Sequence, residues 1–226
     1  MILKPKNRAE WLKARREQGI GGSEAGVVLN LNPYKSPVQL WTEKVGLAEP
    51  DDLSENAAVQ YGKAAEEHIR ALFALDYPEY RIDYHEFWIY AQDDRPWLFA
   101  TLDGEITCKN FAMLDGKTIC ENCTRGILEV KTCTIQNKAQ WDEWDNKIPA
   151  HYFAQVLHQL AATGWDFVIL RAYIRYHKDG EIRATVRDYR IDRADYLPDV
   201  EHLIKKEEEF IGCVRSRTQP KTVIKI

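Results

Sequence analysis

The order in which helical and strand patterns follow one another constrains the fold of this 226-residue chain more than any other feature. Helical patterns come first, at residues 8–16, 24–31, 37–45 and 54–75. Segments typical of β-strands follow at 84–91, 97–102 and 127–132, and residues 105–126 have the pattern of a hairpin. The order ends with a helix at 149–163, two strands at 167–177 and 181–191 joined by Lys178-Asp179-Gly180, and a helix at 199–215. This order predicts a mixed α/β (α+β) fold in which helices flank a central mixed sheet.

Length and hydropathy indicate one medium-sized domain. We expect residues 1–226 to form this domain, with a hairpin insertion at about 105–126. No stretch approaches the roughly 18 apolar residues of a membrane span, and the first residues lack the apolar core of a secretory signal. We therefore expect a cytoplasmic protein with no membrane partner.

The distribution of charge along the chain helps to decide whether this protein could bind nucleic acid. The formal net charge of −4 speaks at first against a nucleic-acid partner. However, the acidic excess is confined to residues 51–105, which hold 13 acidic and 4 basic side chains. Most acidic clusters are solvated surface, but a minority bind cations. Glu66 and Asp103 lie in this segment, so the net charge does not exclude an enzyme that handles DNA through a bound cation.

Five cysteines are an odd number for a disulfide framework, and reduced thiols are the expectation in the cytoplasm. The spacing Cys120-x-x-Cys123, flanked by Cys108 and Cys133, is compatible with a small zinc site. A single such pair with irregular outer partners is weak evidence. Free cysteines in a hairpin insertion are therefore the preferred interpretation.

Three carboxylates and a lysine lie where a metal site is expected. In a strand, Glu129 and Lys131 share one face of the segment Leu128-Glu129-Val130-Lys131-Thr132, whose other residues are expected to pack inward. Asp103 ends an apolar strand just before Gly104, and Glu66 falls on the apolar stripe of the helix at 54–75. Each also has an ordinary structural interpretation. Glu129 and Lys131 could form a surface ion pair, Asp103 could be a turn former, and Glu66 could lie at the margin of the apolar stripe. Hard divalent cations favour such oxygen ligands, and a buried carboxylate needs a partner.

Three further features also have both a functional and an ordinary structural interpretation. Gln155 lies on the helix at 149–163 and is either a hydrogen-bonding residue at the edge of the core or a support for a metal site. Ser23 is a good N-cap for a helix at 24–31, and Gly21-Gly22 before it permits close approach of the backbone to a phosphate. A flexible helix entry is the alternative. Arg15 nearby favours the phosphate, while Lys35 is either a DNA-backbone contact or a solvated lysine.

Taken in order, Gly62-x-x-x-Glu66, Asp103-Gly104, Glu129-Val130-Lys131 and Gln155 resemble the motifs of the PD-(D/E)XK nuclease superfamily. The segment Trp11-x-x-x-Arg15-Arg16, the run Gly19-Ile20-Gly21-Gly22-Ser23-Glu24-Ala25 and then Leu31-Asn32-Pro33-Tyr34 resemble the YqaJ-type viral recombinase nucleases, which are similar to lambda-type exonucleases. The resemblance covers residues 8 to about 175.

The resemblance implies a Mg²⁺-dependent 5′→3′ exonuclease that degrades one strand of linear duplex DNA from a 5′-phosphorylated end. It implies that Glu66, Asp103, Glu129 and the Val130 carbonyl bind two Mg²⁺ ions, for which Mn²⁺ can substitute. Lys131 would orient or deprotonate the attacking water, with Gln155 in support. Arg15, Ser23 and Thr101 would hold the 5′-phosphate, although the family often has Ser where this chain has Thr101.

The resemblance also implies the biological setting. Lambda-type relatives form trimeric rings around DNA and leave 3′ single-stranded tails for a single-strand annealing protein in recombination. A phage or prophage gene acting in the bacterial cytoplasm fits this setting. Two alternatives stay open: a structure-specific or single-strand endonuclease of the same fold, and a non-catalytic module that binds DNA ends.

Overall fold

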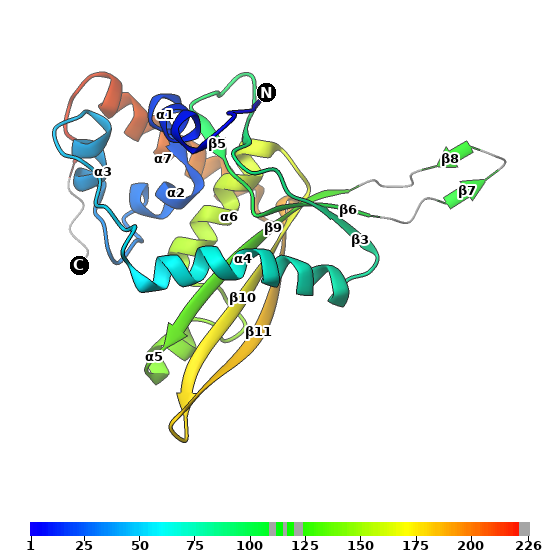
Figure 1. The fold of residues 1–226 in the computed structure, drawn as a ribbon. Coiled ribbons are helices and arrows are strands. Elements are labelled where there is room, and N and C mark those ends of the chain that lie inside the picture. Colours follow the sequence, from blue (N-terminus) through cyan, green and yellow to red (C-terminus); the bar gives the residue numbers. More distant parts are fainter. Residues whose placement is uncertain (109–111, 115–116, 120–123, 222–226) are drawn as a thin grey trace.

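The computed structural model describes residues 1–108, 112–114, 117–119 and 124–221. Its main sheet has five strands in the order β11-β10-β9-β6-β3, and a second sheet has four in the order β1-β4-β5-β2 (Figure 1). The strands are β1 (Ile2–Leu3), β2 (Ile20–Gly21), β3 (Tyr80–Asp83), β4 (Ile89–Ala91), β5 (Leu98–Ala100), β6 (Gly104–Cys108), β7 (Ala112–Leu114), β8 (Lys117–Ile119), β9 (Arg125–Ile135), β10 (Phe167–Lys178) and β11 (Glu181–Asp192). The helices are α1 (Arg8–Gln18), α2 (Gly22–Val28), α3 (Pro37–Lys44), α4 (Ala57–Asp76), α5 (Lys138–Asp142), α6 (Ala150–Thr163), the short η1 (Arg193–Tyr196) and α7 (Leu197–Arg215).

The pairing of β9 with β10 makes the main sheet mixed. These two strands run parallel, with Glu129 opposite Leu170 and Lys131 opposite Ala172, while the other pairs of this sheet are antiparallel. The chain between them includes α6, which begins after Pro149 and ends at Gly164 in the left-handed conformation (φ 70°), as its sequence predicts. The expected mixed sheet with flanking helices is confirmed.

Strand β9 is buried on both of its faces. Leu128 and Val130 pack with Ile69 and Phe73 of α4. Ile127, on the opposite face, belongs to the larger core that includes the apolar residues of α6. The expectation that only Leu128, Val130 and Thr132 pack inward was therefore incomplete, because α4 and α6 cover the two faces. Glu129 is consequently a buried charge, with only 2% of its surface exposed.

The main sheet opens where β6 and β9 stop pairing. Their register runs from Thr107 opposite Arg125 to Gly104 opposite Leu128. Beyond Leu128, the strand β9 loses β6 as its hydrogen-bonding neighbour. Asp103, the residue before β6, takes over by accepting a hydrogen bond from the Val130 N–H at 2.8 Å. A carboxylate thus lies at the side of the buried strand, where the sheet splays apart.

Some expected elements differ in their ends. The strand expected at 84–91 is reduced to β4, because Phe87 takes a left-handed conformation (φ 69°) and the Trp88 N–H closes a turn onto the His85 carbonyl. The hairpin expected at 105–126 begins one residue early with β6 and includes β7 and β8, while residues 109–111, 115–116 and 120–123 of it lie outside the described residues. Cys120 and Cys123 also lie outside them, so the zinc alternative stays open. Within the described part, no helix is both long and apolar enough to cross a bilayer.

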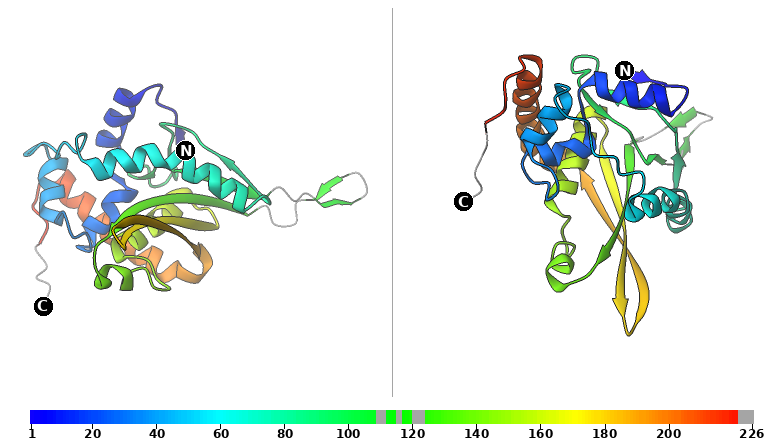
Figure 2. Two further views of the ribbon diagram at one scale, coloured as in Figure 1. Left: turned by 60° about the horizontal axis from the view of Figure 1, so that its bottom comes forward. Right: turned by 60° about the vertical axis from the view of Figure 1, so that its left-hand side comes forward.

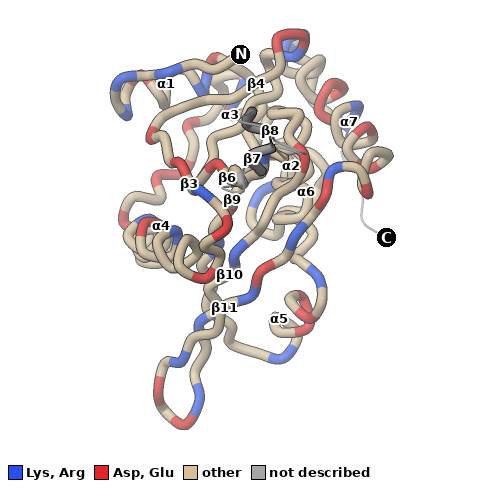
Figure 3. Tube along the Cα trace, turned by 90° about the vertical axis from the view of Figure 1, so that its right-hand side faces the viewer, with Lys and Arg blue, Asp and Glu red and all other residues tan. Residues whose placement is uncertain are grey.

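Two hairpins project from the body of the molecule (Figures 1 and 2). One is formed by the far halves of β10 and β11, and the other carries β7 and β8. The first half of β10 is buried, whereas the half that projects is polar and more exposed. Acidic and basic residues both occur along the β10–β11 hairpin and along α7 (Figure 3). The candidate site lies in the body, where β9, α4 and α6 come together.

Candidate active site

Glu129 is held at three points on the buried strand β9. The Gln155 Nε2 group donates to Oε1 at 2.6 Å, and the Gln159 Nε2 group donates to Oε2 at 2.5 Å. The Lys131 ammonium lies 2.6 Å from Oε1. Since a buried carboxylate is costly without such partners, these contacts explain how Glu129 is tolerated. They also fix its side chain in one orientation.

Asp103 and Glu66 bring two more negative charges to this point. Burial raises the pKa of Asp103 well above its usual range, and repulsion from Glu129 and Glu66 adds to the rise, while Lys131 and the Val130 N–H oppose it. Burial and then the Glu129 charge likewise raise the pKa of Glu66. The three carboxylates therefore act on one another electrostatically, although they come from α4, the start of β6 and β9.

Glu66 reaches the site because α4 approaches β9 closely. A Cβ on Gly62, one turn before Glu66, would lie 3.1 Å from the Thr132 hydroxyl oxygen. The helix then continues along its buried residues Ile69 and Phe73. Arg70 of the same helix donates to the backbone carbonyl of Asp103 at 2.5 Å. This contact ties α4 to the start of β6 and keeps the two carboxylates on facing elements.

Lys131 is the cation within this carboxylate group. Burial alone would lower its pKa, but Glu129 and Asp103 outweigh burial and raise it. The Lys131 ammonium also lies 5.1 Å from the centre of the Tyr152 ring. This geometry favours a charged lysine that orients neighbouring groups over a neutral lysine that removes a proton.

The donor set fits a hard divalent cation. Three carboxylates meet one lysine, and repulsion from Glu129 adds to the effect of burial in raising the pKa values of Glu66 and Asp103. Carboxylate oxygens are the ligands that Mg²⁺ and Mn²⁺ prefer. In the described residues, however, no three His, Cys, Asp or Glu side chains are already arranged to hold an ion. A cation would therefore require some of these carboxylates to turn toward it.

A second group of residues lies around Arg15 of α1. Its guanidinium is 4.5 Å from the centre of the Trp11 ring and 5.9 Å from that of Phe99. Burial lowers the pKa of Arg15, and attraction to Glu24 opposes this shift. A Cβ on Gly21 would lie 3.1 Å from the Phe99 ring and 3.5 Å from the Arg15 Nη2 atom. The absence of a side chain at Gly21 therefore leaves room for a half-buried cation, which is suited to bind an anion.

Ser23 and Thr101 each come shortly after a strand of the second sheet that borders Arg15. Strands β2 and β5 are parallel, with Gly21 opposite Phe99, and Ser23 and Thr101 each follow by two residues. The expectation that Ser23 is an N-cap was wrong: α2 begins at Gly22 and Gly21 is its N-cap, so Ser23 is an exposed residue of the first turn. The helix starts earlier because Glu24 accepts a hydrogen bond from the Gly21 N–H at 2.9 Å.

The two groups of residues adjoin through Gly22. A Cβ at this position would lie 3.4 Å from the Gln155 side chain and 3.5 Å from that of Gln159. The first turn of α2 therefore packs on the same glutamines that hold Glu129. In contrast, Lys35 is bound to Glu43, with its Nζ atom 2.6 Å and 2.9 Å from the two carboxylate oxygens. The structure does not place its charge with Arg15.

Two contributors were missed in the sequence. Gln159 lies four residues after Gln155, which puts both amides on one face of α6, and this spacing was the available signal. The second is the fully buried pair of His158 and Glu207, separated by 2.7 Å. The His158 Nε2 group donates to the Phe99 carbonyl at 2.7 Å, so this pair joins α6 and α7 to β5 behind Arg15. Nothing in the local sequence of His158 indicates Glu207.

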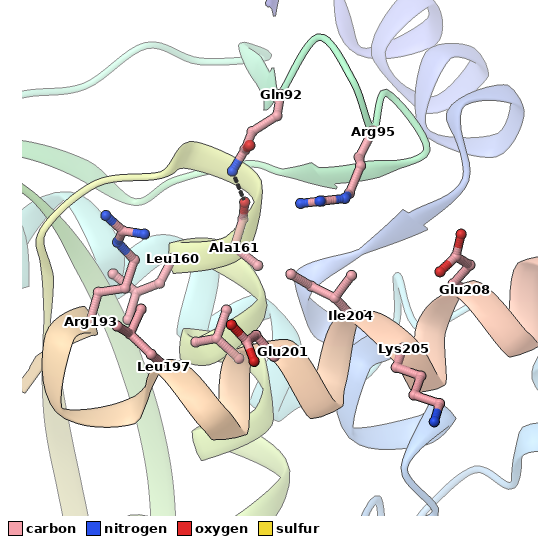
Figure 4. A pocket seen from close by; sticks show the side chains of 11 residues that line it. Gln92, Arg95, Leu160, Ala161, Arg193, Leu197, Glu201, Ile204, Lys205 and Glu208 are labelled. Carbon is pink, nitrogen blue, oxygen red and sulfur yellow. Dashed lines mark hydrogen bonds between the residues drawn. The ribbon is translucent and has the colours of Figure 1, made fainter.

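A cavity of about 450 Å³ lies elsewhere, between α7 and the segment around Arg95 (Figure 4). Its lining includes Arg193, Glu201 and Lys205, with apolar side chains of α6 and α7. None of the sequence-predicted site residues lines it. The carboxylate group is instead assembled at the opening of the main sheet, which suits a long substrate that passes across a surface.

The chain was compared with known proteins. Residues 10–166 match the model of the YqaJ-like viral recombinase domain. The chain is 30% identical over 174 residues to the uncharacterized protein YqaJ of Bacillus subtilis (strain 168), a match that covers 71% of this chain and 44% of that protein. The chain thus spans less than half the length of this relative.

The fold was compared in the same way. It is similar to the crystal structure of the alkaline exonuclease LHK-Exo from Laribacter hongkongensis, with a TM-score of 0.63, 19% identity and coverage of 93% of this chain and 94% of that one. The structure of LHK-Exo in complex with dAMP gives a TM-score of 0.62 at the same identity and coverage. The expected PD-(D/E)XK fold and the expected resemblance are confirmed.

Proposed function

Because this chain belongs to the YqaJ-like viral recombinase domain family, we propose that it is a metal-dependent nuclease acting on DNA. In finer terms, it is a Mg²⁺-dependent 5′→3′ exonuclease that degrades one strand of linear duplex DNA from a 5′-phosphorylated end. The observation that carries this proposal is the buried Glu129 on β9, held by Gln155 and Lys131 beside the Asp103 carboxylate. Residues 1–226 act as one nuclease domain, with 105–126 as an insertion.

In this proposal Glu66, Asp103, Glu129 and the Val130 carbonyl hold two Mg²⁺ ions, for which Mn²⁺ can substitute. When bound, the ions supply charge that stabilises the attacking and leaving oxygens in an in-line displacement. Lys131 donates hydrogen bonds that orient the water and the phosphate, since its ion pair with Glu129 keeps it charged. Gln155 keeps Glu129 turned toward the reacting phosphate.

A separate set of residues would select DNA ends that carry a 5′-phosphate. Arg15 is the charged partner of the terminal 5′-phosphate, because its half-buried guanidinium is stacked on Trp11 and has Gly21 beside it. Ser23, in the first turn of α2, and Thr101, just after β5, add hydroxyl donors. Lys35 would contribute a backbone contact only by leaving Glu43, so it is peripheral to the proposed pocket.

The central experiment digests blunt linear duplexes that carry a 5′-phosphate or a 5′-hydroxyl on one labelled strand, in Mg²⁺, Mn²⁺ or EDTA. We expect metal-dependent loss of the 5′-phosphorylated strand and accumulation of its 3′-ended complement. Lys131→Ala and Asp103→Ala should lose hydrolysis while retaining DNA binding in EDTA. Lys206→Ala is the matched control, because it removes another ion-paired lysine, 2.8 Å from Glu209 on α7.

The other outcomes decide between the alternatives. Efficient cutting of covalently closed circular duplex would replace the exonuclease by an endonuclease of the same fold. Binding to ends with no hydrolysis in any divalent metal, together with stoichiometric Zn²⁺, would indicate a non-catalytic module. Full activity of Lys131→Ala would show that the site is misassigned.

The assembly and setting are also part of the proposal. We expect a homotrimeric ring around DNA and cooperation with a single-strand annealing protein in phage-type recombination in the bacterial cytoplasm. Light scattering tests the ring, and a strict monomer on bound DNA would remove it. Co-purification with an annealing protein encoded beside the same gene tests the partner.

A further inference from the structure

Tyr34 is the most exposed large hydrophobic or aromatic side chain in the described part of the protein. It exposes 87% of its surface, compared with 76% for Leu75 and 64% for Leu47. A single exposed apolar residue needs no special explanation. Its significance here depends on how firmly the ring is held and on what lies beside it.

The segment that carries Tyr34 is fixed by hydrogen bonds. The Asn32 Oδ1 atom accepts from the backbone N–H groups of Tyr34 at 2.8 Å and Lys35 at 3.1 Å. The N–H groups of Leu31 and Asn32 both donate to the Gly26 carbonyl, at 2.8 Å and 3.0 Å. The segment is therefore tied to α2 on one side and leads into the capped start of α3 on the other. Little conformational freedom would be lost when the ring binds a partner.

A short series of contacts joins this segment to the reacting group. Gly26, which accepts the two hydrogen bonds, packs so closely on His151 that a Cβ there would lie 2.9 Å from the His151 Cβ. The His151 ring is centred 4.0 Å from the Tyr152 ring, and Lys131 lies 5.1 Å from the latter. The exposed Tyr34 thus belongs to a segment that is connected to Lys131 of the candidate site through Gly26, His151 and Tyr152.

We propose that Tyr34 stacks on an unpaired nucleobase of the strand that enters the site, and so holds the end of the duplex open. This inference rests on the proposed function. An aromatic face accepts any base, because every base presents a π-surface, and such stacking suits an enzyme that degrades DNA without regard to sequence. The fixed segment positions the ring, and the contacts through His151 and Tyr152 connect it to Lys131, where the phosphate of that strand would bind.

The test measures the affinity for 5′-phosphorylated duplex ends in EDTA, with normal DNA and with DNA whose first three nucleotides of the 5′-ended strand are abasic. We expect Tyr34→Ala to weaken binding of normal DNA about 5- to 150-fold and Tyr34→Phe to bind like the unsubstituted protein. On abasic DNA, Tyr34→Ala and the unsubstituted protein should bind equally. Leu75→Ala, at another highly exposed position, is the control for loss of exposed apolar surface.

An equal loss on normal and abasic DNA, or no loss on either, overturns the stacking role. A change in oligomeric state with unchanged affinity for DNA also overturns it and assigns Tyr34 to a protein contact. Hydrolysis in Mg²⁺ is scored separately on the same DNA. Base-dependent binding without hydrolysis refutes the proposed nuclease and supports stacking, whereas hydrolysis with no effect of Tyr34→Ala refutes only stacking.

Discussion

The substitution Gln159→Leu tests whether Gln159 orients Glu129 for metal binding, apart from any contribution of Gln159 to the stability of the fold. Gln159 is buried, with 1% of its surface exposed, and its Nε2 group donates to Glu129 Oε2 at 2.5 Å. Leucine has a similar volume, so little cavity is expected. The substitution removes one hydrogen bond and leaves one oxygen of a buried carboxylate with one partner fewer.

The two stability effects oppose each other. Leaving the Glu129 oxygen without this donor costs about 1–3 kcal/mol. However, the Gln159 Oε1 atom is itself buried without a hydrogen-bond partner in the described residues, and removing it relieves a cost of about the same size. The net change in the free energy of unfolding should be small. For a chain of this length each kcal/mol shifts the melting temperature by about 2–4 °C, so we expect a shift of only a few degrees.

The effect on metal should be much larger than the effect on melting. Groups that orient metal ligands typically change metal affinity or activity about 10- to 100-fold when substituted. We therefore expect the Mg²⁺ concentration for half-maximal hydrolysis to rise by that factor, measured on 5′-phosphorylated duplex. Gln92→Leu is the matched control, because the Gln92 Nε2 group also bonds α6, through the Ala161 carbonyl at 2.5 Å, away from Glu129. An unchanged Mg²⁺ requirement in folded Gln159→Leu would refute this reasoning.

Three further predictions use other parts of the structure. Arg15→Lys should reduce the preference for a 5′-phosphate over a 5′-hydroxyl about 10- to 150-fold in competition digests, because the planar fork of the half-buried guanidinium is lost. Burial lowers the pKa of His158, but the Glu207 charge and the hydrogen bonds outweigh burial, so the pKa is raised overall. The His158–Glu207 pair should therefore stabilise the fold fully below a pH of about 6.5, the ordinary histidine pKa. This contribution should be lost as the pH rises through the raised pKa. Melting curves from pH 6 to 9 should therefore fall less steeply for Glu207→Gln than for the unsubstituted protein, and parallel curves would contradict this assignment. Burial raises the pKa of the Cys133 thiol to about 11, so iodoacetamide at pH 8 should alkylate it far more slowly in the folded than in the unfolded protein, as read by mass spectrometry.

The elements with strong local signals were predictable. Ser36 caps α3 and Pro37 occupies its first turn, and Gly164 ends α6, because these residues satisfy helix ends through contacts with near neighbours in the chain. The hairpin of β10 and β11 turns at Asp179 and Gly180, both with positive φ, as expected from their residue types. Two predictions were wrong because local contacts that residue type alone does not reveal decided the backbone: the Glu24 side chain bonds the Gly21 N–H, so Gly21 rather than Ser23 caps α2, and a turn at Phe87 interrupts the strand before Ile89.

The residues of the candidate site likewise fall into those that the sequence predicted and those that only the folded structure shows. Strand periodicity placed Glu129 and Lys131 on one face, and the structure brings them to 2.6 Å from each other. Periodicity did not show that α6 would cover this face, and so Gln159 was missed although Gln155 was named. Lys35 was included on charge alone, and only the folded chain shows its ion pair with Glu43.

The sequence by itself determined which residue types are available and which of them share a helix or strand face, because φ/ψ preferences and side-chain periodicity are local properties. It also carried the motif order by which the family is recognised. Only the tertiary structure decided that β6 and β9 stop pairing after Leu128, that Asp103 then bonds Val130, and that α4 brings Glu66 to the same opening. These contacts join residues 18 or more positions apart, and their free energy depends on burial and mutual charge that exist only once the layers have packed.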